Sequence, residues 1–472
     1  MKELVITVNE RWQNQEEAIN FIRSHPAVML DFDMGTGKTR TAIDAMFELP
    51  GVHRVLVLCP KAVVPVWRQN LEKFATGKEW DCWDLQSGTV ARKAENLREF
   101  LKAARASTRR TFVVINYESA WRADLGKLLQ TTVWNAVVLD ESHRVKAAGS
   151  KISRFVAKLG KYTARRLCLS GTPMAHSPLD VYGQYRFLDP TIFGTNYGNF
   201  LQQYAILGGP EKRFVVGYKN QQKLMTKFRS IAVTCRMSDV RERLKLPEAL
   251  PDMVHRVDLP PASRKILRGL ERDMIAACEA GVVVASNVLV KLLRCLQVTS
   301  GFCTTVAAPG APEEISELNH AKAEMLASIL EDVGPTPVVV FATFRHDLDT
   351  IRGVALKVGR EAYELSGRVN ELEAWQTAEG GAVLVVQIQA GAEGVDMTRA
   401  NHAVYFSLPH SLSLYTQSRA RLYRPGQTRP VSFMHIIAAG TVDEGVYRAL
   451  ERKEDIIEGI RAGTFDFGYM KK

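Results

Sequence analysis

The feature that most constrains the fold is two series of short apolar runs, separated by a long stretch of different texture. The runs are AVML (27–30), RVLVLCP (54–60), TFVVIN (111–116), NAVVLD (135–140) and RLCLSGTP (166–173), then PVVVFAT (337–343), AVLVVQI (382–388), HAVYFSL (402–408) and VSFMHIIA (431–438). Runs of this length with turn or helix signals between them are typical of buried strands in a mainly parallel sheet. From 177 to 301, apolar residues recur at helical spacing. We therefore predict an α/β protein with two tandem parallel-sheet lobes and a helical insertion between them.

This pattern also predicts the domain boundaries. We expect a first lobe at 1–176, a helical insertion and linker at 177–310, and a second lobe at 311–472. The segment AAPGAPEEISE (307–317) is rich in proline, glycine and acidic residues, and it reads as a loop or linker before the second lobe.

Composition excludes some classes of protein. No apolar run is long enough to span a bilayer, and the first residues lack the order of a signal peptide, so we expect no membrane partner and a cytoplasmic location. The seven cysteines are scattered without a C-x-x-C pair, which suggests neither a zinc ribbon nor a disulfide framework. The net charge of +11 favours a polyanionic partner, although a merely basic surface would give the same value.

The stretch LDFDMGTGKTRTAID (30–44) has the context of a phosphate-binding loop, with a strand before it and a helix after it. Its Gly37-Lys38-Thr39 fits the end of G-x-x-x-x-G-K-[ST], but Phe32 occupies the first glycine position. Backbone N–H groups of Gly35, Thr36, Gly37, Lys38 and Thr39 would face the β-phosphate of ATP. Lys38 would reach the β and γ oxygens, and Thr39 would offer its hydroxyl to Mg²⁺. A chance glycine-rich turn is the alternative.

A second candidate group lies at the end of WNAVVLDESHRVK (134–146), where Asp140 and Glu141 follow an apolar run. Ligands of open α/β sheets bind at the carboxyl ends of the strands. Asp140 can hold the metal ion, directly or through water, and Glu141 can orient and deprotonate the attacking water. Taken alone, an Asp-Glu pair is more often a solvated turn.

With DESH (140–143) added to these features, the chain resembles the superfamily-two helicase-fold ATPases, specifically their Swi/Snf-like branch, whose lobes are RecA-like. The resemblance covers residues 11–446, in order: QEEAINFI (15–22), LVLCPKAVVPVWRQNLEKF (56–74), VVINYES (113–119), LSGTPM (169–174), CRMSDVRERLKLPE (235–248), VVVFATF (338–344), YELSGR (363–368), QIQAGAEGVDMTRA (387–400), QSRARLYRPGQ (417–427) and AAGTVDEGVYRAL (438–450). Any one of these motifs is weak, but so many in the right order and spacing are strong.

The resemblance implies roles for particular residues. Gln15 would read the adenine edge, and Gly394, Asp396 and Gln417 would also contact the nucleotide. Arg421 and Arg424 would complete the ATP site when the lobes close, and their spacing of three would put them on one helical face. Ser170 and Thr172 would couple hydrolysis to movement. Candidates for nucleic-acid contact are Lys61, Trp67, Asn116, Tyr117 and Arg368.

Four positions depart from the branch's pattern. Asn14 replaces an aromatic residue, so base stacking would have to come from another residue, such as Trp12. Phe32 stands where the branch has an acid, Ala175-His176 replace Gln-Asn, and Asp396 replaces an Asn. None of these removes a group that hydrolysis needs.

The function implied by the resemblance is ATP hydrolysis with Mg²⁺, coupled to translocation on double-stranded DNA through its phosphate backbone. A compact bacterial or phage-type member fits this chain better than a nucleosome remodeller does, and no protein partner can be read from the sequence. Two alternatives stay open: an ATP-switched DNA clamp or recruitment subunit that does not travel, and an RNA-directed helicase, which Asp396 favours.

Overall fold

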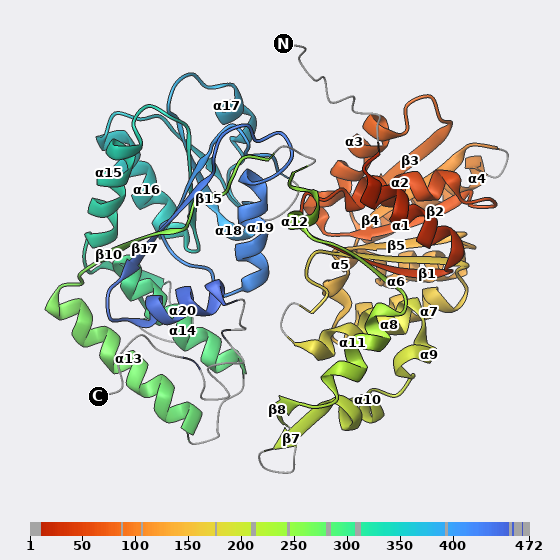
Figure 1. Ribbon diagram of the computed structural model, residues 1–472, viewed down its shortest axis with the longest axis horizontal. Helices are drawn as coiled ribbons and strands as arrows, with labels where there is room; N and C mark the ends of the chain where they lie inside the picture. Colours follow the sequence, from red (N-terminus) through yellow and green to blue (C-terminus); the bar gives the residue numbers. More distant parts are fainter. Residues whose placement is uncertain are drawn as a thin grey trace. The chain divides into compact units, whose positions relative to one another are not determined.

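The computed structural model describes residues 11–85, 88–104, 107–174, 177–208, 214–242, 246–279, 285–306, 313–391 and 395–452, together with Ile456 and Phe465. The chain divides into two compact units, Met1–Glu242 (unit 1) and Arg243–Lys472 (unit 2). Both units have an α/β architecture, so the predicted fold class is confirmed (Figure 1). Among the helices that the structure describes, none combines the length and apolar character that crossing a bilayer requires.

The described part of unit 1 forms a seven-stranded parallel sheet with the order β3-β4-β2-β5-β6-β1-β9. Its strands are β1 (Ala27–Phe32), β2 (Arg54–Cys59), β3 (Trp80–Leu85), β4 (Arg110–Asn116), β5 (Ala136–Asp140), β6 (Arg165–Ser170) and β9 (Ala232–Cys235). Every residue of β1 and β5 is buried, as expected of central strands covered on both faces. The strands β1, β2, β4, β5 and β6 match the predicted runs.

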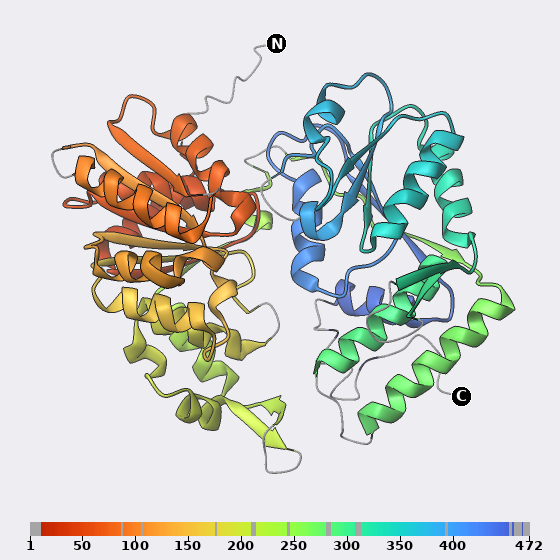
Figure 2. The same ribbon diagram turned by 180° about the vertical axis from the view of Figure 1, so that it is seen from behind.

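Helices cover both faces of this sheet (Figures 1 and 2). On one face lie α1 (Gln13–Ser24), α2 (Lys38–Glu48) and α3 (Val64–Phe74). The other helices of the core are α4 (Val90–Ala103), α5 (Tyr117–Ala120), α6 (Ala123–Thr131) and α7 (Lys151–Lys161). Side chains set several of their starts: Ser150 accepts a hydrogen bond from the Ser153 N–H at the N-cap of α7, and Thr89 does the same for Arg92 at α4.

The first half of the predicted insertion packs onto unit 1. It contains α8 (Val181–Leu188), α9 (Pro190–Phe193), α10 (Tyr197–Tyr204), the antiparallel pair β7 (Ala205–Gly208) and β8 (Phe214–Tyr218), α11 (Gln221–Arg229) and the short helix α12 (Met237–Val240). An aromatic cluster joins α8 to its neighbours, with Tyr185 against Phe193 and Phe228. β9 pairs with β1 at the edge of the first sheet, and α12 follows it.

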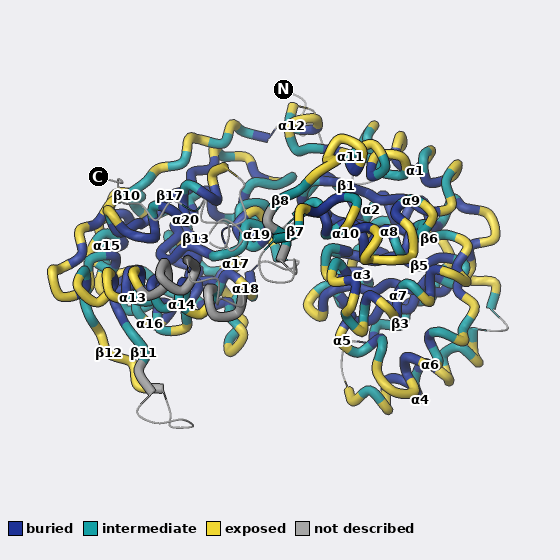
Figure 3. The backbone as a smooth tube through the Cα atoms, turned by 90° about the horizontal axis from the view of Figure 1, so that it is seen from below, coloured by how far each residue is buried: buried dark blue, intermediate teal, exposed yellow. Residues whose placement is uncertain are grey.

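The described part of unit 2 contains a six-stranded parallel sheet with the order β10-β17-β16-β13-β15-β14. Its strands are β10 (Met253–Val257), β13 (Val338–Ala342), β14 (Ala362–Leu365), β15 (Val383–Gln387), β16 (His402–Tyr405) and β17 (Ser432–Ala438). Its helices are α13 (Pro261–Glu279), α14 (Ala285–Ser300), α15 (Ala321–Val333), α16 (Arg345–Lys357), α17 (Leu372–Thr377), α18 (Ile388–Gly391), α19 (Leu412–Leu422) and α20 (Val442–Glu451). Figure 3 shows β1 of unit 1 and β13 of unit 2 within buried segments.

Two sequence expectations differ from the structure. The segment expected to be a loop, 307–317, contains the strand β12 (Glu313–Glu317), which pairs antiparallel with β11 (Phe302–Val306); residues 307–312 lie outside the described part. The sequence also places domain boundaries at 176 and 310, whereas the chain divides between 242 and 243. The reason is that the insertion supplies a strand to each sheet, β9 to the first and β10 to the second.

Candidate active site

Three neighbouring strands of unit 1 bring the predicted ATP-site residues to one edge of the sheet. β5, β6 and β1 are adjacent in that order and parallel. The residues that follow their carboxyl ends are Asp140 and Glu141 after β5, the Ser170-Gly171-Thr172 segment at the end of β6, and the loop before Lys38 after β1. This is the edge at which open α/β sheets bind ligands.

The loop between β1 and α2 has the backbone that a phosphate cradle needs. Gly35 and Gly37 have φ angles of 80° and 91°, in the left-handed region that favours glycine. Gly37 stands at the N-cap of the 11-residue helix α2, so the helix presents its first N–H groups and its positive dipole end at the loop. The Lys38 Nζ is 2.8 Å from the carbonyl oxygen of Phe32 and 3.3 Å from that of Asp33. Thr39 lies in the first turn of the same helix.

Gln15 lies directly against this loop. Its Oε1 accepts a hydrogen bond of 2.9 Å from the Trp12 N–H, at the start of α1, and its side chain is almost fully buried. A Cβ atom placed on Gly37 would lie 2.2 Å from Gln15 Nε2 and 3.5 Å from the Trp12 ring. The φ angle of Gly37 thus favours glycine, and a larger residue there would displace the Gln15 side-chain amide. The structure brings together the predicted adenine reader and the phosphate loop.

Asp140 is held from several directions. The Trp67 indole N–H donates to its Oδ2 across 2.8 Å, its Oδ1 accepts from the Glu141 N–H, and the Tyr117 hydroxyl donates to its carbonyl oxygen. Burial raises the pKa of Asp140 to about 6, and the neighbouring Glu141 acts in the same direction, while Trp67 and Lys38 oppose it. The carboxylate thus sits in a dry, preformed position.

Glu141 adopts an unusual backbone conformation, with φ at 51°. Left-handed conformations of non-glycine residues are costly and cluster at functional sites. Its Oε2 lies 3.4 Å from the Nδ1 of His143, which lies 3.4 Å from the Ser170 Oγ; that oxygen in turn accepts from the Thr172 N–H. His143 therefore links the end of β5 to the end of β6, a role that the sequence analysis did not assign to it.

Gly171 completes the packing around Lys38. A Cβ atom at this position would lie 3.2 Å from the Phe32 carbonyl oxygen and 3.5 Å from the Lys38 Nζ. The carboxyl ends of β1 and β6 therefore lie against each other with almost no free space between them. A larger residue at Gly171 would press first on the Phe32 carbonyl oxygen, to which Lys38 donates.

The remaining predicted nucleotide residues belong to unit 2. Gln417 is buried in α19 and donates to the Ser413 Oγ, and the exposed Asp396 accepts from the N–H and hydroxyl of Thr398. Gly394 lies outside the described residues. The expectation that Arg421 and Arg424 share a helical face is wrong, because α19 ends at Leu422 and Arg424 lies beyond it. Pro425 disfavours the helical conformation at the residue before it.

Arg424 is instead tied to the chain near Asp396. Its Nη1 donates to the Val395 carbonyl oxygen across 3.0 Å, and its Nε lies 4.0 Å from the Asp396 carboxylate. Two predicted nucleotide residues, Arg424 and Asp396, are therefore neighbours within unit 2.

The five candidates for nucleic-acid contact fall into two groups. Trp67, Asn116 and Tyr117 are buried, and the contacts of Trp67 and Tyr117 go to Asp140, so the role that the structure gives these two is to position that residue. Lys61 is exposed and begins the short 3-10 helix that follows β2. Arg368 binds the carboxylates of Glu364 and Asp349, which raise its pKa. Nucleic-acid contact by all five stays a prediction.

One buried lysine escaped the sequence analysis. The Nζ of Lys93, on α4, lies 3.2 Å from the Asn116 Oδ1 and 3.4 Å from the Ser119 Oγ. Burial lowers its pKa, and the nearby Lys61 adds to this effect. Lys93 belongs to no motif, and a lysine in a helix of mixed charge gives no sign in sequence of being buried.

The donor set fits a nucleoside triphosphate with Mg²⁺. A helix N-terminus, two glycines with positive φ and a nearly buried ammonium suit a phosphate chain. Mg²⁺ is usually held by one or two protein oxygens, substrate phosphates and waters. The Thr39 hydroxyl and the Asp140 carboxylate supply such oxygens from α2 and β5.

Fold and site together define a phosphate-loop nucleotide hydrolase with two α/β units, each built around a parallel sheet. The SNF2-related domain matches residues 9–301, more than half of the chain, and the helicase conserved C-terminal domain matches residues 321–426. The chain belongs to the SNF2-related family, and it is an ATP-dependent, helicase-like ATPase.

Known proteins similar to this chain include a phage protein and larger cellular proteins. Protein p41 of Acyrthosiphon pisum secondary endosymbiont phage 1 is 25% identical over 90% of this chain and 92% of its own length. Chromodomain-helicase-DNA-binding protein 1-like of Danio rerio is 24% identical over 94% of this chain and 43% of its own. An ATP-dependent helicase of Mycoplasma pneumoniae is 23% identical over 94% of this chain and 41% of its own length. The chain thus spans less than half of the two larger relatives.

Among solved structures, the chain is similar to the Sulfolobus solfataricus SWI2/SNF2 ATPase core in complex with double-stranded DNA. The TM-score is 0.44 at 20% sequence identity, and the match covers 96% of this chain and 93% of that one.

Proposed function

We propose that this ATPase is a motor that translocates on double-stranded DNA. The observation that carries the proposal is that Lys38 follows the carboxyl end of β1 and Asp140-Glu141 follow that of β5, the two strands that flank β6, in a chain with SNF2-related and helicase C-terminal domains. The net charge of +11 supports a polyanionic track. The name of the Danio rerio relative includes DNA binding.

The residues of unit 1 divide the work of hydrolysis. The N–H groups at the start of α2 and the Lys38 ammonium bind the phosphates, and Gln15 selects the adenine ring. Glu141 takes the proton of the attacking water, and Thr39 and Asp140 hold Mg²⁺. When bound, the ion neutralises charge on the phosphate oxygens. Contacts through His143, Ser170 and Thr172 couple the position of the Glu141 side chain, at the end of β5, to the end of β6.

Residues of unit 2 complete the reaction in this proposal. The family resemblance assigns guanidinium groups of Arg421 and Arg424 to the charge that develops on the γ-phosphate, an interaction that is worth about 10³–10⁵ in rate in phosphoryl transfer. Because Arg424 lies near Asp396, a change at Asp396 is expected to weaken the contribution of Arg424. Alternating engagement of Arg421 and Arg424 would drive movement along the phosphate backbone of DNA. Contacts to that backbone do not read base sequence.

Displacement of a triplex-forming strand from duplex DNA tests translocation directly. A motor strips the third strand in an ATP-dependent manner, whereas a clamp that only switches its shape leaves it bound. We expect displacement by the wild-type chain and none by Lys38→Ala. A wild-type chain that hydrolyses ATP in the presence of duplex but never displaces the third strand would contradict the proposal and favour the clamp.

A further inference from the structure

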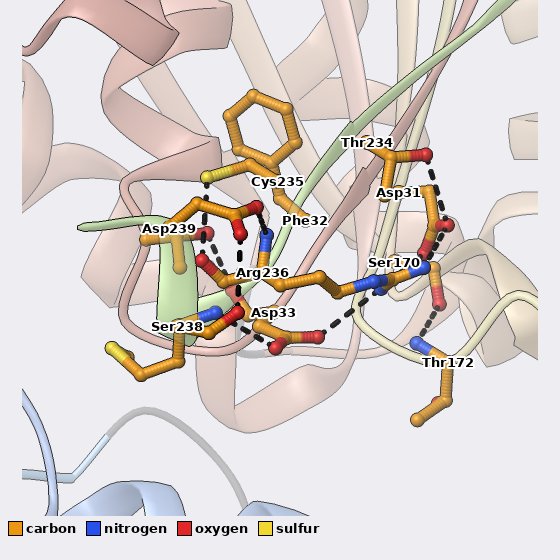
Figure 4. A network of polar contacts seen from close by, with 12 residues as sticks. Asp31, Phe32, Asp33, Ser170, Thr172, Thr234, Cys235, Arg236, Ser238 and Asp239 are labelled. Atoms are coloured by element: carbon orange, nitrogen blue, oxygen red, sulfur yellow. Dashed lines mark hydrogen bonds and ion pairs between the residues drawn. The ribbon is translucent and has the colours of Figure 1, made fainter. Parts of the chain in front are cut away.

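A network of polar contacts joins the phosphate loop to the segment through which the chain leaves unit 1. This exit segment comprises the end of β9 and the short helix α12, and the chain passes into unit 2 after residue 242. Figure 4 shows Arg236 of the exit segment extending along the loop to reach both Asp31 and Asp33. We call these three residues the clasp.

The clasp has the geometry of a strong ion pair. The Arg236 Nη2 and Nη1 lie 2.6 and 3.1 Å from the two carboxylate oxygens of Asp31, a two-pronged contact. The Nη1 also lies 3.2 Å from the Asp33 Oδ1. The Asp31 side chain is only 5% exposed, and burial raises its pKa although Arg236 opposes the rise. The guanidinium is thus the principal compensation for a buried carboxylate.

Asp33 is the residue at which the clasp and the phosphate loop meet. Its N–H donates to the Cys235 carbonyl oxygen across 2.8 Å, and its Oδ2 accepts from the Met237 N–H across 2.9 Å. Its own carbonyl oxygen accepts from the Thr36 hydroxyl at 2.7 Å and from the Lys38 Nζ at 3.3 Å. A triphosphate that takes the Lys38 ammonium competes with this carbonyl. Nucleotide binding therefore changes the donors to a residue that the exit segment holds.

Two departures from the family pattern lie at or beside residues that contact the exit segment. Where the branch has an acid this chain has the buried Phe32, and its acids stand on either side, at Asp31 and Asp33. Where the branch has an aromatic residue before Gln15, Asn14 donates to the Thr36 carbonyl oxygen and lies 3.2 Å from the Cys235 Sγ. Asn14 and the two acids beside Phe32 thus tie the nucleotide loop to 235–237.

From these contacts we propose that Arg236 is a positioning residue for the ATPase reaction. It holds the phosphate loop in its binding conformation through Asp31 and Asp33, and it passes the nucleotide state of the loop to the exit segment. The inference rests on the ATP site proposed above, but it does not require translocation.

Steady-state kinetics without nucleic acid test the positioning role, because they separate it from DNA binding. The full-length variants are Arg236→Ala, Arg236→Lys, Asp33→Asn and the Ala/Asn double variant. We expect the KM for ATP to rise roughly tenfold in Arg236→Ala and Asp33→Asn, as for a coupled pair of this kind. The double variant is expected to be no worse than either single one, and Arg236→Lys to fall between them and wild type.

A matched ion pair elsewhere in unit 1 provides the control. Arg109 Nη1 and Asp81 Oδ1 are 3.3 Å apart with side chains 51% and 35% exposed, against 3.2 Å, 43% and 35% for Arg236 and Asp33. Arg109→Ala and Asp81→Asn are expected to leave the KM for ATP unchanged. Equal KM values for Arg236→Ala and Arg109→Ala, or additive effects in the double variant, would overturn the proposal. If Arg236→Ala fails to fold, Arg236→Lys and Asp33→Asn decide it.

A fluorophore in the exit segment tests the second half of the proposal. Ser238 is exposed, and a dye on Ser238→Cys should respond to ATP with Mg²⁺, while one on Tyr162→Cys, at the exposed end of α7, should not. The Ser238 signal should disappear when Arg236→Ala or Lys38→Ala is added. A signal that survives Arg236→Ala contradicts the coupling, whereas one that survives Lys38→Ala contradicts the proposed ATP site instead.

Discussion

Trp67 donates its indole N–H to the Oδ2 of Asp140 across 2.8 Å, and both side chains are buried. The contact joins α3 to the end of β5, so a residue of the helix that follows β2 fixes the carboxylate assigned to the metal ion.

Replacing Trp67 by Phe keeps an aromatic ring but removes the donor. A buried carboxylate that loses a hydrogen bond is poorly compensated, so we expect kcat to fall about tenfold and the Mg²⁺ concentration for half-maximal activity to rise. A Mg²⁺ titration of ATP turnover measures both. The control is Trp134→Phe, which removes a buried indole donor to the Leu129 carbonyl oxygen and should leave the Mg²⁺ dependence unchanged. An unaltered Mg²⁺ dependence in Trp67→Phe with weaker DNA binding would show that Trp67 contacts DNA instead.

Glu141→Gln should separate binding from chemistry. The amide keeps the size of the side chain but cannot accept the proton of the attacking water, so we expect kcat to fall by about 10²–10⁴. Binding of a fluorescent ATP analogue should remain close to the wild-type value. Full turnover in this variant would mean that another group is the general base.

Gly37→Ala tests the close approach of Gln15 to the loop. An alanine at this position meets both a positive φ and a contact of 2.2 Å with the Gln15 Nε2. Gly51→Ala is the matched control, because Gly51 has a φ of 74° and nothing within 4 Å of an added Cβ. We expect Gly51→Ala to cost roughly 1–2 kcal/mol of stability and to leave ATP affinity intact. Gly37→Ala should also lose ATP affinity; equal affinities in the two variants would contradict the Gln15 contact.

Asp347 in unit 2 predicts a pH dependence of stability. It is 1% exposed, and burial raises its pKa to about 7, well above its ordinary 3.8, although Ser407 donates to its carboxylate. Between these two pH values the unfolded chain ionises while the folded chain stays protonated, so stability falls as pH rises through this window. Asp347→Asn is expected to remove this fall in stability.

The melting temperature of unit 2 at pH 5 and pH 8 measures this effect. Relative to wild type, Asp347→Asn should gain stability at the higher pH, on the order of a few kcal/mol at most. The control Asp332→Asn, at an exposed position, should leave the pH dependence of the melting temperature unchanged. A parallel profile for wild type and Asp347→Asn would show that this carboxyl group does not titrate in the window.

The elements of the fold and the site that can be predicted from the sequence are those whose residues form a local pattern. Buried parallel strands must be apolar, so β1 and β13 are visible as runs, and the phosphate loop is visible because its glycines and Lys38 are contiguous. β3 reads WDCWDL, and its two aspartates, Asp81 and Asp84, disguise an edge strand. β12 reads EEISE, and its charges predict a loop.

Contacts between segments that lie far apart in the sequence could not be predicted from local patterns. The bonds of Trp67 and Tyr117 to Asp140 span 73 and 23 residues, and the clasp between Arg236 and Asp31 spans 205. Aromatic residues in a motif do not reveal whether they face a ligand or a carboxylate, because both arrangements use the same residue types. The end of α19 before Arg424 was visible in principle, since Pro425 follows directly.

The most direct measurement compares ATP turnover by the full chain alone, with duplex DNA and with RNA of equal length. We predict that duplex DNA raises kcat severalfold or more, that RNA raises it far less, and that Lys38→Ala shows no turnover under any condition. Turnover that stays at the basal rate with every duplex tested, in protein that binds ATP, would contradict a DNA-driven motor; stronger stimulation by RNA would assign the motor to that polymer.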